Sequence, residues 1–329
     1  MLISIIIPVY NAEKYIEKCL KSILTIEDNI EIIVINDGSV DNTKEILETY
    51  EVKYPNIRCI HQKNSGVSVS RNTGMEHANG DYLMFVDADD VFDKDMYNNL
   101  VSMVKQNDID FVYGDYNTIS ENDTIYDYMK MKKGIDSIDA LKKYYLSHAD
   151  LNTCWGKIFK TNIVKINNIR FPKNMKIGED RIFVGNYLEH ISNFKYINKP
   201  VYKYRIVQSG AMGSTMYTIS KEKIDDFTKC LIYGEKFADR NNLSKDEFHI
   251  EYASKCVAMI NIMLRAKRSF KLENMEAHRL LLTPAIKKNL KVTLKIKNQN
   301  KKKRMIYKML SNSFGITVYV FLKHVLQKH

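Results

Sequence analysis

The sequence predicts an α/β fold, in which a Rossmann-like, mostly parallel sheet is flanked by helices and followed by a C-terminal helical region. Three observations predict it. Apolar runs of strand length alternate with helical patterns over the first hundred residues, polar clusters follow the strands, and the alternation does not return after about Ser220. The 329 residues suffice for one large domain and a smaller one.

The strands expected first are Ile3–Ile7, Glu31–Ile35, Ile57–His61 and Tyr82–Val86. The helical patterns between them are Ala12–Leu24, Thr43–Tyr50 and Val67–His77. Ser65 is the expected N-cap of the third of these helices. Strands that alternate with helices in this way form parallel sheets with both faces covered.

The segments after residue 100 are less regular. We expect a strand at Phe111–Tyr116, a helix at Ser137–Ser147, a loop at Asn152–Lys160 and an edge strand at Val201–Arg205. The pattern from about Ser220 onward is helical only. We therefore place a boundary near Tyr217–Lys221, which divides the chain into residues 1–217 and 218–329.

Charge, cysteines and hydropathy narrow the class of protein. The net charge is +11, and residues 277–329 hold thirteen lysines and arginines and no acid, so the excess charge lies in a basic tail. Five cysteines without ligand-like spacing indicate neither a disulfide framework nor a zinc site, which favours a reducing cytoplasm. The Leu2–Ile7 run has strand length and no basic leader, so we expect no export signal, and we expect no segment that spans a bilayer.

Polar clusters follow three of the expected strands. They are Pro8-Val9-Tyr10-Asn11, Asn36-Asp37-Gly38-Ser39 and Asp87-Ala88-Asp89-Asp90. Ligands of open α/β sheets bind beyond the carboxyl ends of the strands. These three loops are therefore expected to converge on one rim.

The acidic cluster has three interpretations. Asp87 and Asp89 flank one small residue, a spacing that suits a shared Mg²⁺ or Mn²⁺ completed by water and substrate phosphates. The alternative is a solvated turn in which Asp90 or Asp93 caps the following helix. A calcium-binding EF-hand is excluded because Phe92 stands where that loop requires glycine.

Four motifs, in this order along the chain, resemble those of family 2 glycosyltransferases. They are Ile6–Asn11, Asn36–Ser39, Ser70–Gly74 and Phe85–Asp90. Trp155-Gly156-Lys157 and Gly178-Glu179-Asp180 extend the likeness to roughly residue 215. The resemblance implies a GT-A fold, with a nucleotide-sugar half over about residues 1–115 and an acceptor half over about residues 116–217.

By this likeness the donor site consists of Pro8, Tyr10, Asp37, Arg71, Asp87, Ala88 and Asp89. Pro8, Tyr10 and Asp37 would hold the base, with Arg71 near it. Asp87 would reach the ribose or a metal-bound water, and Asp89 would be the principal ligand of a Mn²⁺ or Mg²⁺ ion that bridges to the diphosphate. Without the likeness, Asp37 is part of a common Asp-Gly turn and Arg71 forms a surface ion pair.

Transfer of a sugar to a hydroxyl needs a group that takes the hydroxyl's proton. The resemblance implies that Asp180 is this general base, in a single displacement with inversion at the anomeric carbon. Glu179 is a close rival, and both acids would also suit the start of a helix. The resemblance places Trp155, Lys157 and Glu179 beside the acceptor, while Trp155 would otherwise be a core aromatic.

Two further contacts to the donor are considered. By the same likeness, Arg205, Ser209 or Ser214 would touch the diphosphate. Relatives of this fold often use a histidine as an additional metal ligand, but no histidine lies between His190 and His249. The third protein ligand of the metal is therefore left unassigned.

The basic tail also has two interpretations. Lys287–Arg304 is strongly cationic and Met305–Lys328 has apolar residues at helical spacing, a pattern typical of a helix lying on anionic lipid. The alternative is a helical cap packed on the enzyme with a solvated basic face. We do not expect nucleic acid as a partner, because no zinc knuckle, RRM signature or aromatic-interleaved basic groove accompanies the charge.

We therefore expect a metal-dependent, inverting hexosyl- or N-acetylhexosaminyltransferase. It would move a sugar from a nucleotide sugar, with a UDP-sugar as the expected donor, to a glycan or lipid-linked glycan of a surface polysaccharide or glycoconjugate, at the cytoplasmic face of the plasma membrane. Two alternatives stay open. One is a nucleotidyltransferase, although the first strand lacks the usual glycine-rich phosphate loop, and the other is a non-catalytic glycan- or membrane-binding module.

Overall fold

The computed structural model describes most of the chain, as two compact units. The described residues are 1–26, 29–92, 94–106, 108–120, 124–129, 134–148, 150–205, 220–264, 270–296 and 300–326. The first unit, here called the sheet unit, comprises Met1–Lys142, Asp150–Met175 and Glu179–Ile206. The second, here called the helical unit, comprises Lys143–Ala149, Lys176–Gly178 and Val207–His329.

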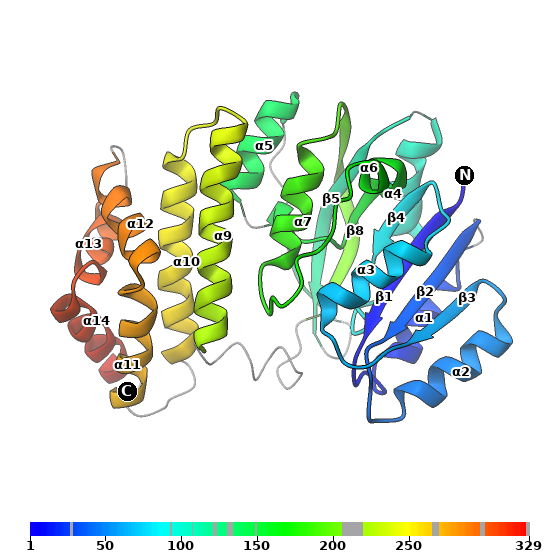
Figure 1. Cartoon of the computed structure of the whole chain (residues 1–329), viewed down its shortest axis with the longest axis horizontal. Coiled ribbons are helices and arrows are strands. Elements are labelled where there is room, and N and C mark those ends of the chain that lie inside the picture. The colour runs from blue at the N-terminus through cyan, green and yellow to red at the C-terminus, as the bar shows by residue number, and fades with distance from the viewer. Residues whose placement is uncertain are drawn as a thin grey trace. The chain divides into compact units, whose positions relative to one another are not determined.

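The sheet unit is built on one mixed, mostly parallel sheet (Figure 1). Its strands are β1 Ile3–Val9, β2 Ile30–Asn36, β3 Ile57–His61, β4 Tyr82–Phe85, β5 Phe111–Ile119, β6 Ile125–Met129, β7 Lys157–Lys160 and β8 Phe194–Arg205. The strand order is β3-β2-β1-β4-β7-β5-β6, and β8 pairs with β5. The first four strands are parallel, β7 runs antiparallel to β4 and β5, and β8 is parallel to β5. The predicted fold class is confirmed.

Helices cover both faces of this sheet. They are α1 Ile16–Ile23, α2 Thr43–Lys53, α3 Val67–His77, α4 Lys94–Gln106, α6 Thr161–Ile166 and α7 Glu179–Leu188, with a short 3₁₀ turn at Asp150–Asn152. Helix α5 Ile138–Ser147 begins in the sheet unit and ends in the helical unit. Because side chains alternate along a strand, Ile5 of β1 lies in one core with Leu20 of α1 and Leu100 of α4. Ile6 points to the opposite face, where α3 approaches so closely that a Cβ on Gly74 would lie 2.4 Å from its Cγ2 atom.

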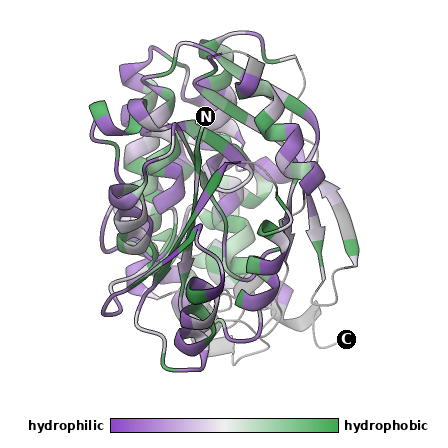
Figure 2. Cartoon of the chain, turned by 90° about the vertical axis from the view of Figure 1, so that its right-hand side faces the viewer, coloured by the Kyte–Doolittle hydropathy of each residue, from purple (hydrophilic) through white to green (hydrophobic). Residues whose placement is uncertain are grey.

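The hydropathy of the elements follows from this layering. In Figure 2 both the strands and the helices carry green and purple stretches. β1 and β2 are almost wholly buried because each lies between neighbouring strands and under helices. Apolar residues in succession therefore mark the central strands, as parallel sheets require.

The helical unit contains six helices among its described residues. They are α9 Lys221–Arg240, α10 Asp246–Leu264, α11 Phe270–Leu281, α12 Pro284–Lys295, α13 Lys301–Leu310 and α14 Ser313–Leu326. The Oγ atom of Ser220 caps α9 by accepting a hydrogen bond from the Lys223 N–H at 3.3 Å. Leu310 and Val320 of the basic tail are fully buried, as expected for a packed helical cap, whereas Phe314 is 80% exposed. Within the described ranges, no helix has both the length and the apolar character needed to cross a bilayer.

Two details of the predicted elements were wrong, and a third element begins earlier than predicted. Ser65 does not cap α3, because the first helical turn follows Gly66 and the Ser65 hydroxyl donates to the Lys63 carbonyl oxygen instead. The predicted loop Asn152–Lys160 ends in strand β7, which fills the space between β4 and β5. The predicted edge strand is confirmed as β8, but it already begins at Phe194.

Candidate active site

The carboxyl ends of β2, β1 and β4 meet at one edge of the sheet, as predicted. The Asp37 N–H donates to the Val9 carbonyl at 2.8 Å, which joins the ends of β2 and β1. The Asn11 N–H donates to Ser39 Oγ, and Asn11 Oδ1 accepts from the Val40 N–H, each at 2.9 Å. The two loops are thus tied to each other, and the acidic loop follows β4 directly beside them.

Asp37 organises the turn that leads into α3. Its Oδ1 atom accepts hydrogen bonds from Gln62 Nε2 at 2.7 Å and the Ser65 N–H at 2.8 Å, and its Oδ2 atom accepts from the Gly66 N–H at 2.8 Å. The carboxylate therefore fixes, from a different loop, the two residues that directly precede α3. Gly38 is required beside it, because its φ is +72° and a Cβ there would lie 2.7 Å from the Asn64 nitrogen.

The other predicted contacts to the base lie at the same rim. Tyr10 is 47% exposed, so its ring is accessible, while Pro8 is half-buried at the end of β1. Ala88 is buried between the two acids of the predicted metal site. Stacking of a base against Tyr10 stays a prediction.

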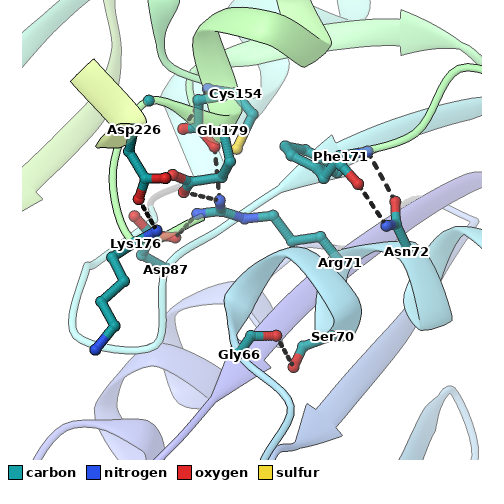
Figure 3. A network of polar contacts seen from close by, with 12 residues as sticks. Gly66, Ser70, Arg71, Asn72, Asp87, Cys154, Phe171, Lys176, Glu179 and Asp226 are labelled. Atoms are coloured by element: carbon teal, nitrogen blue, oxygen red, sulfur yellow. Dashed lines mark hydrogen bonds and ion pairs between the residues drawn. The ribbon is translucent and has the colours of Figure 1, made fainter. Parts of the chain in front are cut away.

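Arg71 lies at the centre of the acidic residues (Figure 3). Its Nη2 atom donates to Asp87 Oδ1 at 2.9 Å, and its Nη1 atom donates to Glu179 Oε1 at 3.0 Å and Asp180 Oδ1 at 2.6 Å. One guanidinium group thus joins an acid of the predicted donor site to both acids of the predicted acceptor side, which lie more than one hundred positions further along the chain.

Packing fixes the position of Arg71. The side chain is only 4% exposed, and its guanidinium carbon lies 5.3 Å from the centre of the Phe171 ring. The neighbouring Asn72 exchanges two hydrogen bonds with the main chain of Phe171, at 2.8 and 2.9 Å. The surface ion pair considered for Arg71 was therefore wrong, and its described hydrogen bonds go to the three acids rather than toward Asp37.

The acids around Arg71 carry more negative charge than one guanidinium can balance. Three carboxylates face the single cation, which leaves an excess of two negative charges when all are ionised. Burial, with Asp180 adding to it, raises the pKa of Glu179 to about 7. Burial also raises the pKa of Asp87 although Arg71 opposes this, and burial together with Asp87 raises the pKa of Asp89 to about 6. Such a cluster favours binding of a cation.

The residues present fit a hard divalent cation held only in part by the protein. Asp87 and Asp89 offer carboxylate oxygens, and one oxygen of Asp87 is already engaged by Arg71. Among the described residues, no three histidine, cysteine or acidic side chains are grouped closely enough to hold a metal. Water and a phosphate-bearing ligand would have to supply the remaining oxygens.

Strand β8 holds the acidic loop from the side. The buried Asp90 carboxylate accepts hydrogen bonds from the Tyr202 hydroxyl and the Arg205 N–H, each at 2.7 Å, and burial raises its pKa well above the usual range. The Asp87 N–H donates to the Tyr202 hydroxyl at 3.1 Å. Asp90 therefore supports the loop from inside the fold, and its suggested role as a helix cap was wrong; Asp93 lies outside the described residues.

Arg205 also binds the acidic loop. Its Nε atom donates to the Asp89 carbonyl at 2.6 Å, and its Nη1 atom donates to the Ser120 carbonyl at 3.0 Å. These bonds position the main chain of Asp89, whereas the predicted contact was to the diphosphate. Ser209 and Ser214, the other predicted contacts, lie outside the described residues.

The two acids of the predicted acceptor side begin helix α7. Asp180 is held at both oxygens, since Oδ1 accepts from Arg71 and Oδ2 accepts from the Cys154 N–H at 3.1 Å. Its side chain is 18% exposed and that of Glu179 is 12% exposed. Both acids therefore have a solvent-accessible part and a fixed orientation.

The structure places the other two predicted acceptor contacts in the core. Trp155 is 6% exposed and stacks on Tyr202 and Tyr204, with ring centres 4.7 and 5.3 Å away. Lys157 is fully buried in β7, where it donates to Thr153 Oγ1 at 2.9 Å, and burial lowers its pKa to about 8. The core-aromatic alternative for Trp155 therefore fits the burial of its ring, and contacts of Trp155 or Lys157 with an acceptor stay a prediction that the burial of both side chains disfavours.

Comparison with known proteins identifies related sequences. A sequence model described as "Glycosyl transferase family 2" matches residues 4–164. "Glycosyltransferase GlyG" of Streptococcus pneumoniae serotype 4 is 30% identical over 252 residues, which cover 71% of this chain and 82% of that protein. "Glycosyltransferase GlyA" of the same organism is 33% identical over 62% of this chain, and the match spans only 30% of that longer protein. "Uncharacterized glycosyltransferase YibD" of Escherichia coli K12 is 32% identical over 61% of this chain and 60% of that protein.

Solved structures show the same fold. Residues 1–349 of Staphylococcus aureus TarS match 100% of this chain and 92% of that chain with a TM-score of 0.66 and 20% identity. The complex of that protein with UDP-GlcNAc matches with a TM-score of 0.64 and 19% identity. At this identity the likeness shows the architecture, which agrees with the mostly parallel sheet and the C-terminal helices described above.

Proposed function

The chain belongs to glycosyltransferase family 2, and from this premise we propose that it transfers a hexosyl or N-acetylhexosaminyl group from a UDP-sugar to a hydroxyl of a glycan or lipid-linked glycan, with inversion. The names of several relatives support the class of acceptor. They include a minor teichoic acid biosynthesis protein and a poly(ribitol-phosphate) beta-glucosyltransferase. The crystallised complex of TarS with UDP-GlcNAc supports the class of donor.

One observation carries the proposal: the carboxylate of Asp180 is joined through a single guanidinium group to Asp87 of the acidic loop. An acid that can take a proton and an acid that can help to bind a diphosphate are thus held together at the same rim. Displacement of a diphosphate by a hydroxyl needs these two groups close to each other.

The donor half of the site would bind the nucleotide and its phosphates. Tyr10 offers an exposed ring to the base, with Pro8 beside it, and the buried Asp37 would accept from the base in addition to the Gly66 N–H that Oδ2 already binds. Asp89, assisted by Asp87, would hold a Mn²⁺ or Mg²⁺ ion. When bound, such an ion neutralises charge on the departing diphosphate.

The acceptor half would remove a proton. The Asp180 carboxylate accepts the proton of the acceptor hydroxyl as its oxygen forms the new bond to the anomeric carbon. The bond between that carbon and the diphosphate oxygen breaks, and the diphosphate leaves with the electron pair. Attack opposite the leaving group inverts the anomeric centre. Arg71 and the Cys154 N–H hold Asp180 in place during this step.

The test compares Asp180→Asn with Glu179→Gln as a matched control in the same helical turn. With Mn²⁺ and a panel of UDP-, GDP- and CMP-sugars, Asp180→Asn is expected to lower transfer by about 10²–10⁴-fold while nucleotide binding is kept, because a general base is lost and little else changes. Glu179→Gln should lose less. Transfer by Asp180→Asn at nearly the wild-type rate would refute the assignment. Formation of sugar 1-phosphate and a nucleoside triphosphate when pyrophosphate is added would instead identify a nucleotidyltransferase.

We also propose that the enzyme works in the cytoplasm and that its basic tail touches an anionic membrane surface. A hollow of about 600 Å³ on α12 is lined by Lys287, Lys288, Lys291 and Lys295, and no acid occurs in residues 277–329. Such a cationic surface, with the exposed Phe314 on α14, is what peripheral binding to anionic lipid uses.

Vesicle binding tests this contact. Replacing Lys287, Lys291 and Lys295 together by Glu should abolish low-salt binding to vesicles that contain anionic lipid, whereas Lys53→Glu with Lys173→Glu should not. Wild-type binding should fall at high salt and be absent with neutral vesicles. Equal binding by both variants would show that the tail is only a packed cap.

A further inference from the structure

Arg71 does more in this fold than balance charge. We propose that it is a positioning residue that fixes the base Asp180 at a set distance from Asp87 of the donor site. This inference rests on the proposed function, since it concerns the alignment of the two halves of the same site. In the proposed reaction Arg71 contacts the base and neither the sugar nor the acceptor hydroxyl, so its effect would act through Asp180.

The geometry of the guanidinium group carries the argument. Nη2 reaches Asp87 Oδ1 at 2.9 Å, and Nη1 reaches Asp180 Oδ1 at 2.6 Å. Because the group is planar and its nitrogen atoms are held by covalent bonds, the spacing between these two acids is set by the dimensions of one side chain. No flexible linker lies between the donor acid and the base.

Arg71 can act as a rigid reference because its own surroundings are fixed on several sides. Phe171 lies against the guanidinium group, and its main chain is joined to Asn72 by two hydrogen bonds. Further along α3, Gly74 lets the helix lie directly on Ile6 of β1. At the start of the same helix, Asp37 holds the Ser65 and Gly66 N–H groups. Asp180 is therefore held at a fixed position relative to the sheet, through Arg71 and α3.

Asp180 depends on Arg71 for one of its two restraints. With Arg71 removed, the hydrogen bond from the Cys154 N–H at 3.1 Å stays, and the carboxylate can rotate about it. A lysine would not replace Arg71 fully, because a single ammonium group is a point charge without two separated donor nitrogen atoms. The loss should appear mainly in turnover, since Arg71 forms no described hydrogen bond with Tyr10, Asp37 or Asp89, and Asp87 loses only its bond to Nη2.

The first experiment separates turnover from binding. Arg71→Met is expected to lower kcat for transfer about 10²-fold, with a donor KM within about threefold of wild type, because displacement of a catalytic group by about 1 Å has effects of this size. Arg71→Lys should recover part of the loss. The control is Arg58→Met, at an exposed position of β3. Loss of Mn²⁺-nucleotide binding in parallel with turnover would overturn the proposal, because Arg71 would then be a donor-binding residue.

A second experiment needs no activity, so failure of this inference and failure of the proposed function can be told apart. Unfolding free energies are measured for Arg71→Met, Asp180→Asn and the double variant, and Arg71→Met is crystallised. We expect non-additive effects and a displaced Asp180 carboxylate. Additive effects, or an Asp180 in its original place, would overturn the inference whether or not the wild type transfers sugar. If the unfolding free energies are non-additive but the wild type uses no sugar donor, only the proposed function is overturned.

Discussion

Replacement of Asp37 by alanine should destabilise the sheet unit far more than replacement of its neighbour Ser65. The Asp37 carboxylate accepts three hydrogen bonds, from Gln62 Nε2, the Ser65 N–H and the Gly66 N–H, at 2.7 to 2.8 Å. In Asp37→Ala the two N–H groups lose their acceptor. Ser65 and Gly66 are exposed, so water can replace part of what the carboxylate provides, and a loss of about 1 kcal/mol for each of the two bonds gives a cost of about 2 kcal/mol.

Urea denaturation at pH 7 measures this cost, and Ser65→Ala is the matched control. The Ser65 hydroxyl donates only to the Lys63 carbonyl at an exposed site, so its removal should cost less than about 1 kcal/mol. The Ser65 main chain is one of the groups that Asp37 binds, so the two variants probe the same contact from its two sides. Equal costs for the two variants, or a cost below about 1 kcal/mol for Asp37→Ala, would refute the role of Asp37 in holding the residues that precede α3.

Three further predictions concern the metal site and the core. Burial raises the pKa of Asp89 to about 6, so its carboxylate is protonated below that pH. Titration calorimetry should therefore show that the affinity for Mn²⁺ rises about tenfold per pH unit up to about pH 6 and then levels off. An affinity that does not change from pH 5 to 7 would contradict Asp89 as a metal ligand. Gly74→Ala should cost about 1–3 kcal/mol in urea unfolding, because the new methyl group overlaps Ile6, and a neutral change would contradict the packing of α3 on β1. Trp155→Leu should lower the free energy of unfolding by about 2–3 kcal/mol, because the Trp155 ring packs on Tyr202. The acceptor KM of the folded fraction should stay unchanged. A raised acceptor KM at unchanged stability would instead support stacking of Trp155 on a sugar.

The parts of the fold that follow from local patterns could be predicted from the sequence. Ile57–His61 and Val67–His77 agree with the observed β3 and α3 at both ends, because apolar periodicity and glycine or proline boundaries are local signals. The convergence of the loops followed from the same patterns, since parallel strands must end at one edge. β7 was missed because Lys157 is polar and the strand has only four residues.

The connections within the site could not be predicted in the same way. Arg71 lies 108 and 109 positions from Glu179 and Asp180, and no periodicity links residues so far apart. Asp37 is followed by Gly38 as in an ordinary Asp-Gly turn, and only the tertiary structure brings the Ser65 and Gly66 N–H groups, which precede α3, to its carboxylate. The hydrogen bonds of Tyr202 with Asp87 and Asp90 have no sequence signal, because nothing in the sequence distinguishes this tyrosine from other aromatic residues of a strand. Motifs therefore indicated which residues matter, whereas their mutual arrangement required the fold.

The support of the acidic loop by β8 has a consequence for how the protein is made. The chain is synthesised from its N-terminus, so β1 to β4 can pair before Tyr202 and Arg205 have been synthesised. Until those two residues emerge, the Asp90 carboxylate has neither of the donors that satisfy it in the finished protein. A nascent chain that ends before β8 should therefore form the sheet of β1 to β4 while its acidic loop is only loosely held. The proposed donor site would be complete only after more than two hundred residues have been translated.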